Sequence, residues 1–344
     1  MISLPTPTHV PLRGGAALRW GVLAPGSIAG AWVGTVHANT DQRVVAVASR
    51  SLDRAHAFAA THGIEHAYGD YEQLVADPDV DVVYIAAPHS EHRTLALLAI
   101  GAGKHVLVEK PIGLNAGEAR EIAAAARAAG VFAMEAMWSR FLPQTTVIAQ
   151  LLDQRAFGEV LTVTGDFGAR FDFDPDGRAF NPALGGGALL DVGVYPAWLA
   201  HFVLGAPANV TATGSLAVTG VDAQAAVILD YESSAQAVIT TSMLVDTPLT
   251  ATINGTLARL EFDGPFMGPA SFRFIVGAEG GAGAEVAQFA EPDGFVWSQG
   301  LCYQATAVAQ HIADGLTESP LHSLDDTIAV LEVLDDARRQ LGAL

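Results

Sequence analysis

Cysteine is almost absent from this 344-residue sequence, which contains only Cys302. One cysteine forms no disulfide within the chain, which excludes the small disulfide-stapled folds and fits a reducing cytoplasm. Half of the residues are hydrophobic and 16% are charged, so a large core can form, and the length suffices for two domains.

Basic residues are also scarce, with 18 lysines and arginines against 37 aspartates and glutamates and a formal net charge of −19. Repulsion between like charges argues against nucleic acid and anionic membrane surfaces as partners. An anionic cofactor would therefore need a local group of cations. Only Lys104 and Lys110 are lysines, so a lysine at a ligand site is not easily explained as one of many surface lysines.

We find no apolar run as long as a membrane span and expect no membrane partner. Residues 1–16 hold prolines and glycines without a signal-peptide core, so we expect them to form a flexible leader. We assign residues 17–140 to a first domain and residues 141–344 to a second.

The first domain alternates between strand and helix patterns. Such alternation predicts a parallel sheet with right-handed crossovers, the Rossmann architecture of dinucleotide-binding domains. The expected strands are residues 17–23, 43–48, 80–86, 106–108 and 132–136, and the expected helices are residues 27–39, 52–61, 70–77, 91–101 and 116–129.

The apolar strand at 106–108 runs directly into Glu109, Lys110 and Pro111. An apolar run bounded by turn residues is typical of a central strand, and open α/β sheets bind ligands at the carboxyl ends of their strands. We therefore expect Lys110 at the rim of a ligand site. The alternative is a solvated lysine that happens to follow a strand.

A phosphate-binding turn is expected between the first strand and the first helix. The fingerprint G-x-G-x-x-G/A falls on Ala24, Gly26 and Ala29, so its first glycine is replaced by alanine. Gly26 still allows the backbone to approach a pyrophosphate, and the helix N-terminus at Ser27 and Ile28 offers N–H groups to an anion.

The end of the second strand indicates which nucleotide binds. NAD sites usually have Asp or Glu there, whereas this sequence has Ser49, followed by Arg50 and Arg54. Two guanidinium groups beside a small polar residue suit a 2′-phosphate, so we expect NADP, with NAD as the other cofactor to test. The alternative is two surface arginines at the start of a helix.

His62 and His66 match an H-x-x-E-H metal pattern. Gly63 lies between them, where the ligand helix would have to continue, so we expect no metal at this site.

A second pair, His89 and His92, follows Ala87 and Pro88 at the end of the strand expected at 80–86. That position is beside the crevice of a dinucleotide-binding sheet. We expect all four residues to line the cofactor site.

Together these motifs resemble the Gfo/Idh/MocA family of oxidoreductases, from Leu18 to the C-terminus. Within it they resemble the branch that contains dimeric dihydrodiol dehydrogenase, NADP-dependent aldose (xylose) 1-dehydrogenase and glucose–fructose oxidoreductase. Two positions depart from the family pattern, Ala24 for glycine and His89, where relatives often carry asparagine. The segments that carry the resemblance are Ala87–His89 with His92, Gly103–Pro111, Met134–Pro143 and Gly185–Tyr195.

The resemblance implies hydride transfer between a nicotinamide and a hydroxyl or carbonyl carbon of a sugar, polyol or dihydrodiol. Tyr195 would exchange a proton with the substrate oxygen, and Lys110 would lower the pKa of that tyrosine from its ordinary value near 10. Asp191 would accept a hydrogen bond from a second hydroxyl. The resemblance also places three residues near the cofactor: Glu109, Trp138 and Arg140.

Residues 189–200 are expected to form a helix that carries Asp191 and Tyr195 on one face, four residues apart. Three glycines at 185–187 would let the backbone pass close to a ligand or to the neighbouring domain. In the alternative, Asp191 caps the helix and Tyr195 belongs to the core. A loop with Phe171, Phe173 and Arg178 is expected to line the substrate pocket.

The second domain is rich in strand patterns and predicts an α+β domain built on a large open, mostly antiparallel sheet. By the resemblance, one face of that sheet joins subunits into a homodimer or a higher homo-oligomer. The expected strands are residues 160–167, 209–218, 225–231, 235–245, 250–255, 258–262 and 271–276, with a glycine-rich turn at 277–283 and helices at 144–154, 300–315 and 324–342.

Two other functions stay open. One is reduction of a keto sugar or an anhydro sugar by the same chemistry. The other is a non-catalytic, cofactor-binding regulator on the same fold, which the loss of Lys110 or Tyr195 would favour. Both residues are present.

Overall fold

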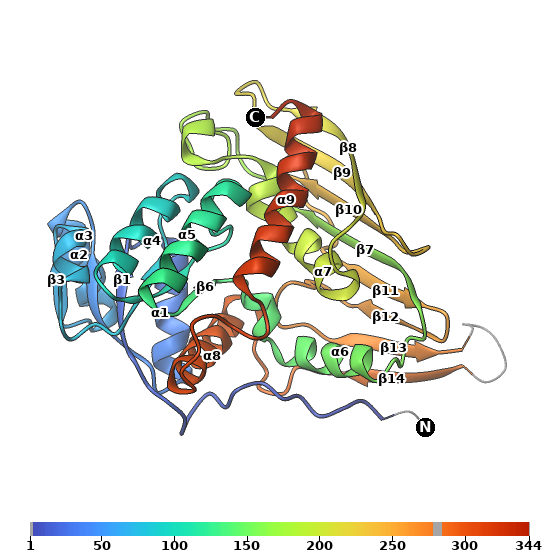
Figure 1. Cartoon of the computed structure of the whole chain (residues 1–344), viewed down its shortest axis with the longest axis horizontal. Coiled ribbons are helices and arrows are strands. Elements are labelled where there is room, and N and C mark those ends of the chain that lie inside the picture. The colour runs from blue at the N-terminus through green and yellow to red at the C-terminus, as the bar shows by residue number, and fades with distance from the viewer. Residues whose placement is uncertain (1–2, 278–283, 344) are drawn as a thin grey trace. The chain divides into compact units, whose positions relative to one another are not determined.

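The computed structural model describes residues 3–277 and 284–343, and Figure 1 shows their helices and strands. The chain divides into two compact units, each built from more than one segment. The parallel-sheet unit consists of His9–Phe141 and Ser298–Ile328. The large-sheet unit consists of Met1–Thr8, Leu142–Trp297 and Ala329–Leu344.

The parallel-sheet unit contains a six-stranded sheet in the order β3-β2-β1-β4-β5-β6, with every pair parallel. This is the strand order of dinucleotide-binding domains, in which the order reverses between β1 and β4. The expected Rossmann architecture is confirmed, and the boundaries of the expected elements differ by at most two residues, but strand β3 (His66–Tyr68) was not predicted. The strands are β1 (Arg19–Leu23), β2 (Arg43–Ala48), β3 (His66–Tyr68), β4 (Val82–Ile85), β5 (His105–Val108) and β6 (Ala133–Glu135); the helices are α1 (Ser27–Asn39), α2 (Leu52–His62), α3 (Tyr71–Val75), α4 (His92–Gly101) and α5 (Ala116–Ala129), with 3₁₀ turns η1 (His89–Glu91) and η2 (Trp138–Phe141).

Local signals explain where these helices begin and end. The side chains of Ser51, Asp70 and Asn115 accept backbone N–H groups at the starts of α2, α3 and α5. Gly63 and Gly130 end α2 and α5 with φ of +66°, a left-handed conformation that glycine adopts without strain.

Residues 298–328 complete the parallel-sheet unit, although the sequence led us to place them in the second domain. After η5 (Trp297–Leu301), helix α8 (Cys302–Ala313) packs against α1. The chain then follows β6, the edge strand, where Ala133 N donates to Thr317 O at 3.0 Å. A segment far away in sequence thereby protects the open edge of the sheet.

The large-sheet unit contains eight strands in the order β14-β13-β12-β11-β7-β10-β9-β8. Only β7 and β10 pair in parallel, so the expected mostly antiparallel sheet is confirmed. We did not predict β14, and after Gly277 the expected glycine-rich turn lies outside the described residues. The strands are β7 (Val160–Gly168), β8 (Asn209–Leu216), β9 (Asp222–Asp230), β10 (Gln236–Ser242), β11 (Ala251–Gly255), β12 (Ala258–Phe262), β13 (Phe272–Val276) and β14 (Glu285–Phe289).

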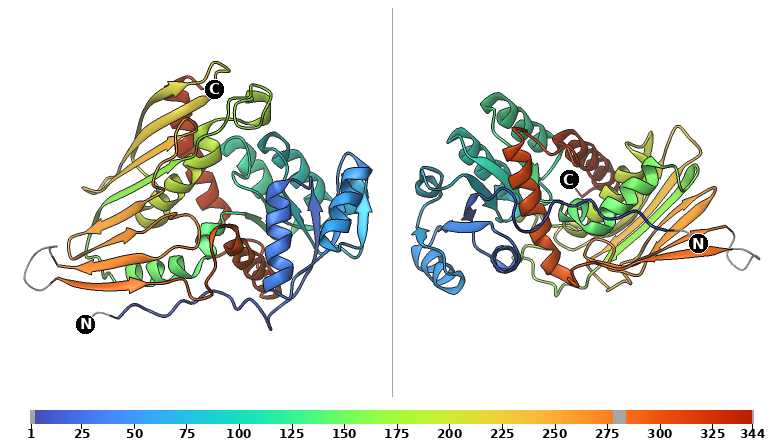
Figure 2. Two further views of the ribbon diagram at one scale, coloured as in Figure 1. Left: turned by 180° about the vertical axis from the view of Figure 1, so that it is seen from behind. Right: turned by 90° about the horizontal axis from the view of Figure 1, so that it is seen from below.

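Helices cover one face of this sheet, as the views in Figure 2 show for α6 (Pro143–Asp153) and α7 (Val194–Leu204). Burial alternates along β10, where Ala237 and Ile239 are buried and Val238 and Thr240 are exposed. A period of two is expected for a sheet with one covered face. The last helix, α9 (Leu324–Leu341), belongs to the large-sheet unit from Ala329 onward.

The expectation that no apolar stretch reaches the length of a membrane span needs a correction. Pro182–Leu204, with 23 residues, is long and apolar enough by length and composition. Most of its apolar part, 78%, is buried inside the structure, as in the core helix of a soluble protein.

The leader contains no helix or strand over residues 3–16, but hydrogen bonds hold it at several points. In the large-sheet unit, Thr8 N donates to Thr146 Oγ1 at 3.0 Å. In the parallel-sheet unit, Gly14 N donates to Asp41 Oδ2 at 2.7 Å.

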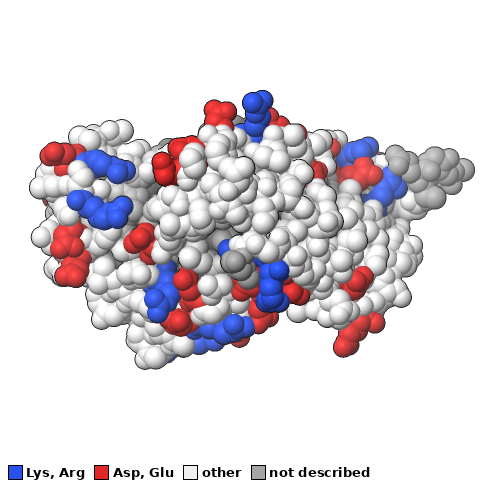
Figure 3. All heavy atoms as spheres, turned by 90° about the horizontal axis from the view of Figure 1, so that it is seen from above, with Lys and Arg blue, Asp and Glu red and all other residues white. Residues whose placement is uncertain are grey.

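Acidic and basic side chains are interspersed on the face of the molecule that Figure 3 shows. Within the large-sheet unit, Arg259 and Arg273 both pair with Glu261. Pairs of this kind mask part of the surface charge, although exposed ion pairs add little stability.

Candidate active site

Four neighbouring strands end at predicted site residues. Ala24 follows β1, Ser49 follows β2, Ala87 lies just beyond β4, and Glu109 and Lys110 follow β5. The carboxyl ends of parallel strands meet at one edge of a sheet, where α/β domains bind nucleotides. The parallel-sheet unit therefore brings the predicted cofactor residues together, whereas Asp191 and Tyr195 belong to the large-sheet unit.

The phosphate-binding turn keeps its shape despite the missing glycine. Ala24 has φ of +62°, in the left-handed region that favours glycine, and its N–H donates to Ala48 O at 3.0 Å. A Cβ atom built on Gly26 meets nothing within 4 Å. The backbone at Gly26 and the first N–H groups of α1, at Ser27 and Ile28, thus suit a pyrophosphate.

Two guanidinium groups gather beyond the end of β2. Arg54 Nη2 reaches back toward Pro25 O of the phosphate-binding turn, at 3.5 Å. Burial raises the pKa of Tyr71, and the positive charges of Arg50 and Arg54 each lower it by a smaller amount. Ser49 is buried, and its Oγ accepts a backbone N–H at 3.3 Å.

His92 connects the turns that follow β4 and β5. It is fully buried, with Nδ1 2.7 Å from Pro111 O and Nε2 2.9 Å from Ala87 O. Its pKa is lowered, chiefly by burial. The ring of His89, also buried, lies 5.7 Å from that of His92. His92 therefore supports the expected cofactor site through the backbone of two turns.

Glu109 is a buried carboxylate at the end of β5. Tyr84 Oη donates to its Oε1 at 2.5 Å, and Lys110 N donates to its Oε2 at 3.2 Å. Burial raises the pKa of Glu109, while Tyr84 and the charge of Lys110 lower it in smaller part. Trp32 of α1 stacks on the Tyr84 ring at 4.3 Å. We did not predict the contact of Glu109 with Tyr84, because Tyr84 lies on β4 and Glu109 follows β5.

Trp138 and Arg140 lie in η2 and are both buried. Arg140 Nε donates to Leu321 O at 2.8 Å. The expected contact of these side chains with the cofactor stays a prediction.

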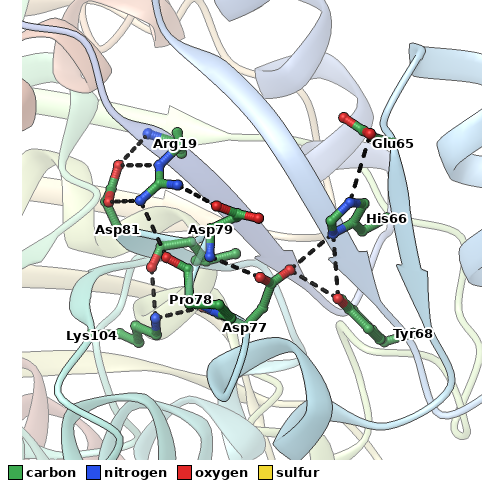
Figure 4. A network of polar contacts seen from close by, with 10 residues as sticks. Arg19, Glu65, His66, Tyr68, Asp77, Pro78, Asp79, Asp81 and Lys104 are labelled. Carbon is green, nitrogen blue, oxygen red and sulfur yellow. Dashed lines mark hydrogen bonds and ion pairs between the residues drawn. The ribbon is translucent and has the colours of Figure 1, made fainter.

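The two lysines lie at opposite edges of the parallel sheet. Lys104, just before β5, donates to Asp77 O and to Val80 O, both at 2.7 Å (Figure 4). Nearby, Arg19 at the start of β1 pairs with Asp81 at 2.8 Å. Lys104 thus has a structural role at the amino ends of the parallel strands, whereas Lys110 lies at their carboxyl ends.

The residues of the H-x-x-E-H pattern separate in the structure. The ring of His62 packs on Phe58 at 4.4 Å, whereas His66 Nδ1 lies 3.1 Å from Asp77 Oδ2 (Figure 4). The Asp77 hydrogen bond is the main cause of the raised pKa of His66. Across residues 3–277 and 284–343, no group of three or more His, Cys, Asp or Glu is arranged to hold a metal ion.

The segment with Asp191 and Tyr195 is not the continuous α-helix that we expected over residues 189–200. A π-helical turn, η4 (Leu189–Gly193), precedes α7 (Val194–Leu204). A π turn holds more residues than an α turn, so a spacing of four does not align the two side chains as predicted. Pro196 offers no N–H to an α-helical ladder, which disfavours the regular helix. Such turns are frequent at functional sites.

The glycines at 185–187 lie against residues of their own unit. A Cβ on Gly186 would be 2.6 Å from Ala179 O, and one on Gly187 would be 2.5 Å from Asp222 Oδ1. We expected a close approach of the backbone to a ligand or to the neighbouring domain; the close approach seen at Gly186 and Gly187 is to residues of the large-sheet unit.

Asp191 forms an ion pair with Arg178, whose Nη1 donates to Oδ1 at 2.7 Å. Asp191 is buried, and the Arg178 side chain is 45% exposed. Burial would lower the pKa of Arg178, but the carboxylate of Asp191 raises it overall. The ring of Tyr195, also buried, lies 5.5 Å from that of Phe167 on β7. A tyrosine and a charged carboxylate on consecutive turns can exchange a proton and orient a hydroxyl group.

The sequence did not reveal Asp222, the buried first residue of β9. Its Oδ2 accepts the N–H of Leu189 at 2.6 Å, at the start of η4. Burial raises its pKa to about 6, although the backbone N–H of Leu189 and the charge of Arg338 partly oppose this. A carboxylate at a helix N-terminus is favourable for the helix dipole. Asp222 thereby fixes the start of the segment that carries Asp191 and Tyr195.

Comparison with protein families identifies both units. The family described as "Oxidoreductase family, NAD-binding Rossmann fold" matches residues 18–137, and the "GFO/IDH/MocA C-terminal domain" matches residues 146–261.

Among curated relatives, trans-1,2-dihydrobenzene-1,2-diol dehydrogenase of Xenopus laevis is 39% identical over 333 residues, covering 95% of this chain and 99% of the relative. The human protein of that name is 34% identical over 335 residues, covering 95% and 97%.

Solved structures are similar as well. An aldose-aldose oxidoreductase from Caulobacter crescentus complexed with glycerol has a TM-score of 0.83 and 25% identity, covering 94% of this chain and 97% of its own. A 3-ketoreductase from Actinomadura kijaniata in complex with TDP-benzene and NADP has a TM-score of 0.76 and 26% identity, covering 94% and 97%.

Replacement of Asp222 should change how stability depends on pH. Its pKa is about 6 in the folded protein against an ordinary 3.8, so the folded state loses stability as pH rises from about 4 to about 7. At 1.36 kcal/mol per pH unit, this amounts to on the order of 3 kcal/mol. We expect Asp222→Asn to gain thermal stability relative to wild type across this range, measured as Tm at each pH.

Asp166→Asn is the matched control in the same unit. Burial would raise the pKa of Asp166, but its hydrogen bonds lower it overall, so its ionisation stabilises the protein above pH 4. The control should lose Tm at every pH between 5 and 8. A Tm difference for Asp222→Asn that does not change with pH would contradict our account of this carboxylate.

Proposed function

The chain belongs to the Gfo/Idh/MocA family of NAD(P)-dependent oxidoreductases, and from this premise we propose that it oxidises a hydroxyl-bearing carbon of a trans-dihydrodiol or a sugar with NADP. Similarity to trans-1,2-dihydrobenzene-1,2-diol dehydrogenase over 99% of that relative's length carries the proposal. A polar, uncharged diol also fits a site segment in which Asp191 is already neutralised by Arg178.

The carboxyl edge of the parallel sheet fits a dinucleotide. The open backbone at Gly26 and the start of α1 suit the pyrophosphate, and Arg50 and Arg54 suit a 2′-phosphate. When bound, the nicotinamide would accept or donate the hydride. Arg50 and Arg54 favour NADP over NAD, because their positive charges can attract the additional 2′-phosphate of NADP. Without them, a chain with a formal net charge of −19 would repel that phosphate.

We propose Tyr195 as the group that exchanges a proton with the substrate oxygen. The positive charge of Lys110 would lower the pKa of this tyrosine and stabilise negative charge that develops on the oxygen. Asp191, held by Arg178 at 2.7 Å, would accept a hydrogen bond from a second hydroxyl of the substrate. Both oxygens of a carboxylate can accept hydrogen bonds, so Asp191 can pair with Arg178 and still accept from a substrate hydroxyl.

Reduction of a keto sugar is the second candidate function, because the similar Actinomadura kijaniata enzyme is a 3-ketoreductase. The same groups serve both directions of hydride transfer. In reduction Tyr195 would donate its proton, and in oxidation it would accept one.

We further propose a homodimer formed through the face of the large sheet opposite α6 and α7, which no helix among the described residues of this unit covers. Ile228 and Val238 pair across β9 and β10 and are 41% and 38% exposed. Burial of such a pair between subunits would remove apolar surface from water.

We also propose a cytoplasmic location. A single cysteine cannot form a disulfide within the chain, so an oxidising compartment would add no such stabilisation.

The cofactor proposal predicts a specific loss of NADP affinity. Replacement of both Arg50 and Arg54 by alanine should raise the Kd for NADP on the order of 100-fold, because charge-assisted hydrogen bonds to the 2′-phosphate are lost. The Kd for NAD should stay within about threefold. Titration followed by tryptophan fluorescence measures both constants.

Arg43→Ala is the control, since Arg43 begins the same strand, β2, at its other end and donates to local carbonyl groups. It should leave both constants unchanged. Tighter binding of NAD than NADP to wild type would overturn the preference, and binding of neither would remove the cofactor proposal.

The catalytic proposal predicts a large loss of turnover without loss of cofactor. Tyr195→Phe and Lys110→Met should each lower kcat on the order of 10²- to 10⁴-fold, the usual size of general acid–base contributions. NADP affinity of Tyr195→Phe should stay within about threefold. Steady-state rates with dihydrodiols, aldoses and keto sugars provide the measurement.

Lys104→Met is the control for Lys110→Met. It removes the two hydrogen bonds to Asp77 O and Val80 O, so Tm should fall while kcat stays within about twofold. Full activity of Tyr195→Phe would exclude its role. A wild-type protein that binds NADP but turns over none of these substrates would favour a regulator instead.

The dimer proposal predicts that Val238→Arg yields monomers. Two unpaired guanidinium groups would then be forced into the interface. Mass should be measured by light scattering after gel filtration, with Leu257→Arg as the control, because Leu257 is 61% exposed and lies between β11 and β12. A monomeric wild type would reject the proposal.

A further inference from the structure

Glu135, at the end of edge strand β6, is a buried carboxylate whose hydrogen bonds reach two other parts of the parallel-sheet unit. Its side chain is 1% exposed. Oε1 accepts the N–H of Ile112 at 2.9 Å. Oε2 lies 3.1 Å from His322 Nε2 and accepts the hydroxyl of Thr327 at 3.2 Å.

Ile112 is two residues after Lys110, and the peptide unit between Pro111 and Ile112 is held at both of its polar atoms. Its oxygen, on Pro111, lies 2.7 Å from His92 Nδ1. Its N–H, on Ile112, donates to Glu135. A peptide unit bonded on both sides cannot rotate freely, so the direction in which the chain leaves Lys110 is fixed.

The groups that hold Glu135 come from the segment that follows α8. His322 and Thr327 also contact each other, with 3.1 Å between Nε2 and Oγ1. A further hydrogen bond attaches this segment to the turn that follows β6, because Arg140 Nε in η2 donates to Leu321 O at 2.8 Å. Residues far apart in sequence therefore meet behind the turn that carries Lys110.

An apolar residue at position 135 would fill the same space without the desolvation cost of a buried carboxylate. Glu109, at the end of the neighbouring strand, is a second buried carboxylate, and the charge of Lys110 lowers its pKa while the charge of Glu135 raises it. A residue that only fills space at β6 does not need a hydrogen-bond acceptor, whereas a residue that fixes the N–H of Ile112 in the turn after Lys110 does.

We propose that Glu135 is a positioning residue for Lys110, and that His322 and Thr327 hold its carboxylate in place. The proposal rests on the proposed function of Lys110. It assigns to the segment 316–328 a task in the active site, although none of its residues needs to touch substrate or cofactor.

The test uses the fact that Lys104 and Lys110 are the two lysines of the chain. Whole protein is treated with limiting formaldehyde and a borohydride reductant, and the methylation rate of each lysine is measured by peptide mass spectrometry. Lys104, at the opposite sheet edge, is the internal reference. We expect Glu135→Ala to change the Lys110/Lys104 rate ratio at least threefold.

The kinetic readout should separate turnover from binding. Glu135→Ala should lower kcat on the order of 10- to 100-fold, because small displacements of a catalytic group are costly, while KM for NADP stays within about threefold. Glu135→Gln should recover most of kcat, since its amide oxygen can still accept the Ile112 N–H. Thr327→Val should lower kcat about two- to fivefold.

Glu118→Ala is the matched control. Glu118 Oε2 accepts the N–H of Leu114 at 2.8 Å, a bond of the same kind in the continuation of the same turn. The Glu118→Ala variant should leave the Lys110/Lys104 methylation rate ratio unchanged. If Glu135→Ala does not fold, Thr327→Val, which removes the hydroxyl that donates to Glu135 Oε2, decides the question by the same two readouts.

An unchanged rate ratio and an unchanged kcat in folded Glu135→Ala, or in Thr327→Val where Glu135→Ala does not fold, would overturn the proposal, as would an equal effect of Glu118→Ala. Failure of the proposed function looks different. In that case Lys110→Met keeps wild-type kcat, while the methylation ratio still reports whether Glu135 positions this lysine.

Discussion

A buried carboxylate must be hydrogen-bonded, and this constraint shapes both units of the protein. Glu109 accepts the N–H of Lys110, Glu135 accepts that of Ile112, and Asp222 accepts that of Leu189. Each of these N–H groups belongs to a segment that carries a proposed catalytic residue. The carboxylates thus fix backbone, and the backbone directs the functional side chains.

Burying these carboxylates lowers the stability of the folded protein, and their hydrogen bonds fix the conformation of the backbone. Burial raises the pKa of Glu109 and of Asp222, which shows that their ionised forms are disfavoured where they lie. Proteins retain such groups mainly where a unique geometry matters. The left-handed Ala24 and the π turn at Leu189–Gly193 belong to the same pattern, because each departs from the least strained local structure at a proposed site.

The sequence predicted much of the fold because its local signals agree with one another. Alternating strand and helix patterns gave the parallel sheet, and turn residues after the strands placed Ala24, Ser49, Ala87 and Lys110 at its carboxyl edge. The pattern failed where tertiary contacts override it. A continuous helix was expected over 189–200, but a π turn at Leu189–Gly193 precedes α7, and Pro196 offers no N–H to a regular α-helical ladder.

By itself, the sequence determined the fold class, the strand ends that form the nucleotide edge and the residue types available for proton exchange. These follow from interactions between near neighbours, which a linear pattern records. Only the tertiary structure decided that Lys104 is structural, that Arg178 pairs with Asp191, and that His322 lies behind the turn of Lys110. Such contacts join residues up to 187 positions apart, and no local pattern encodes a partner that only folding brings within hydrogen-bonding distance.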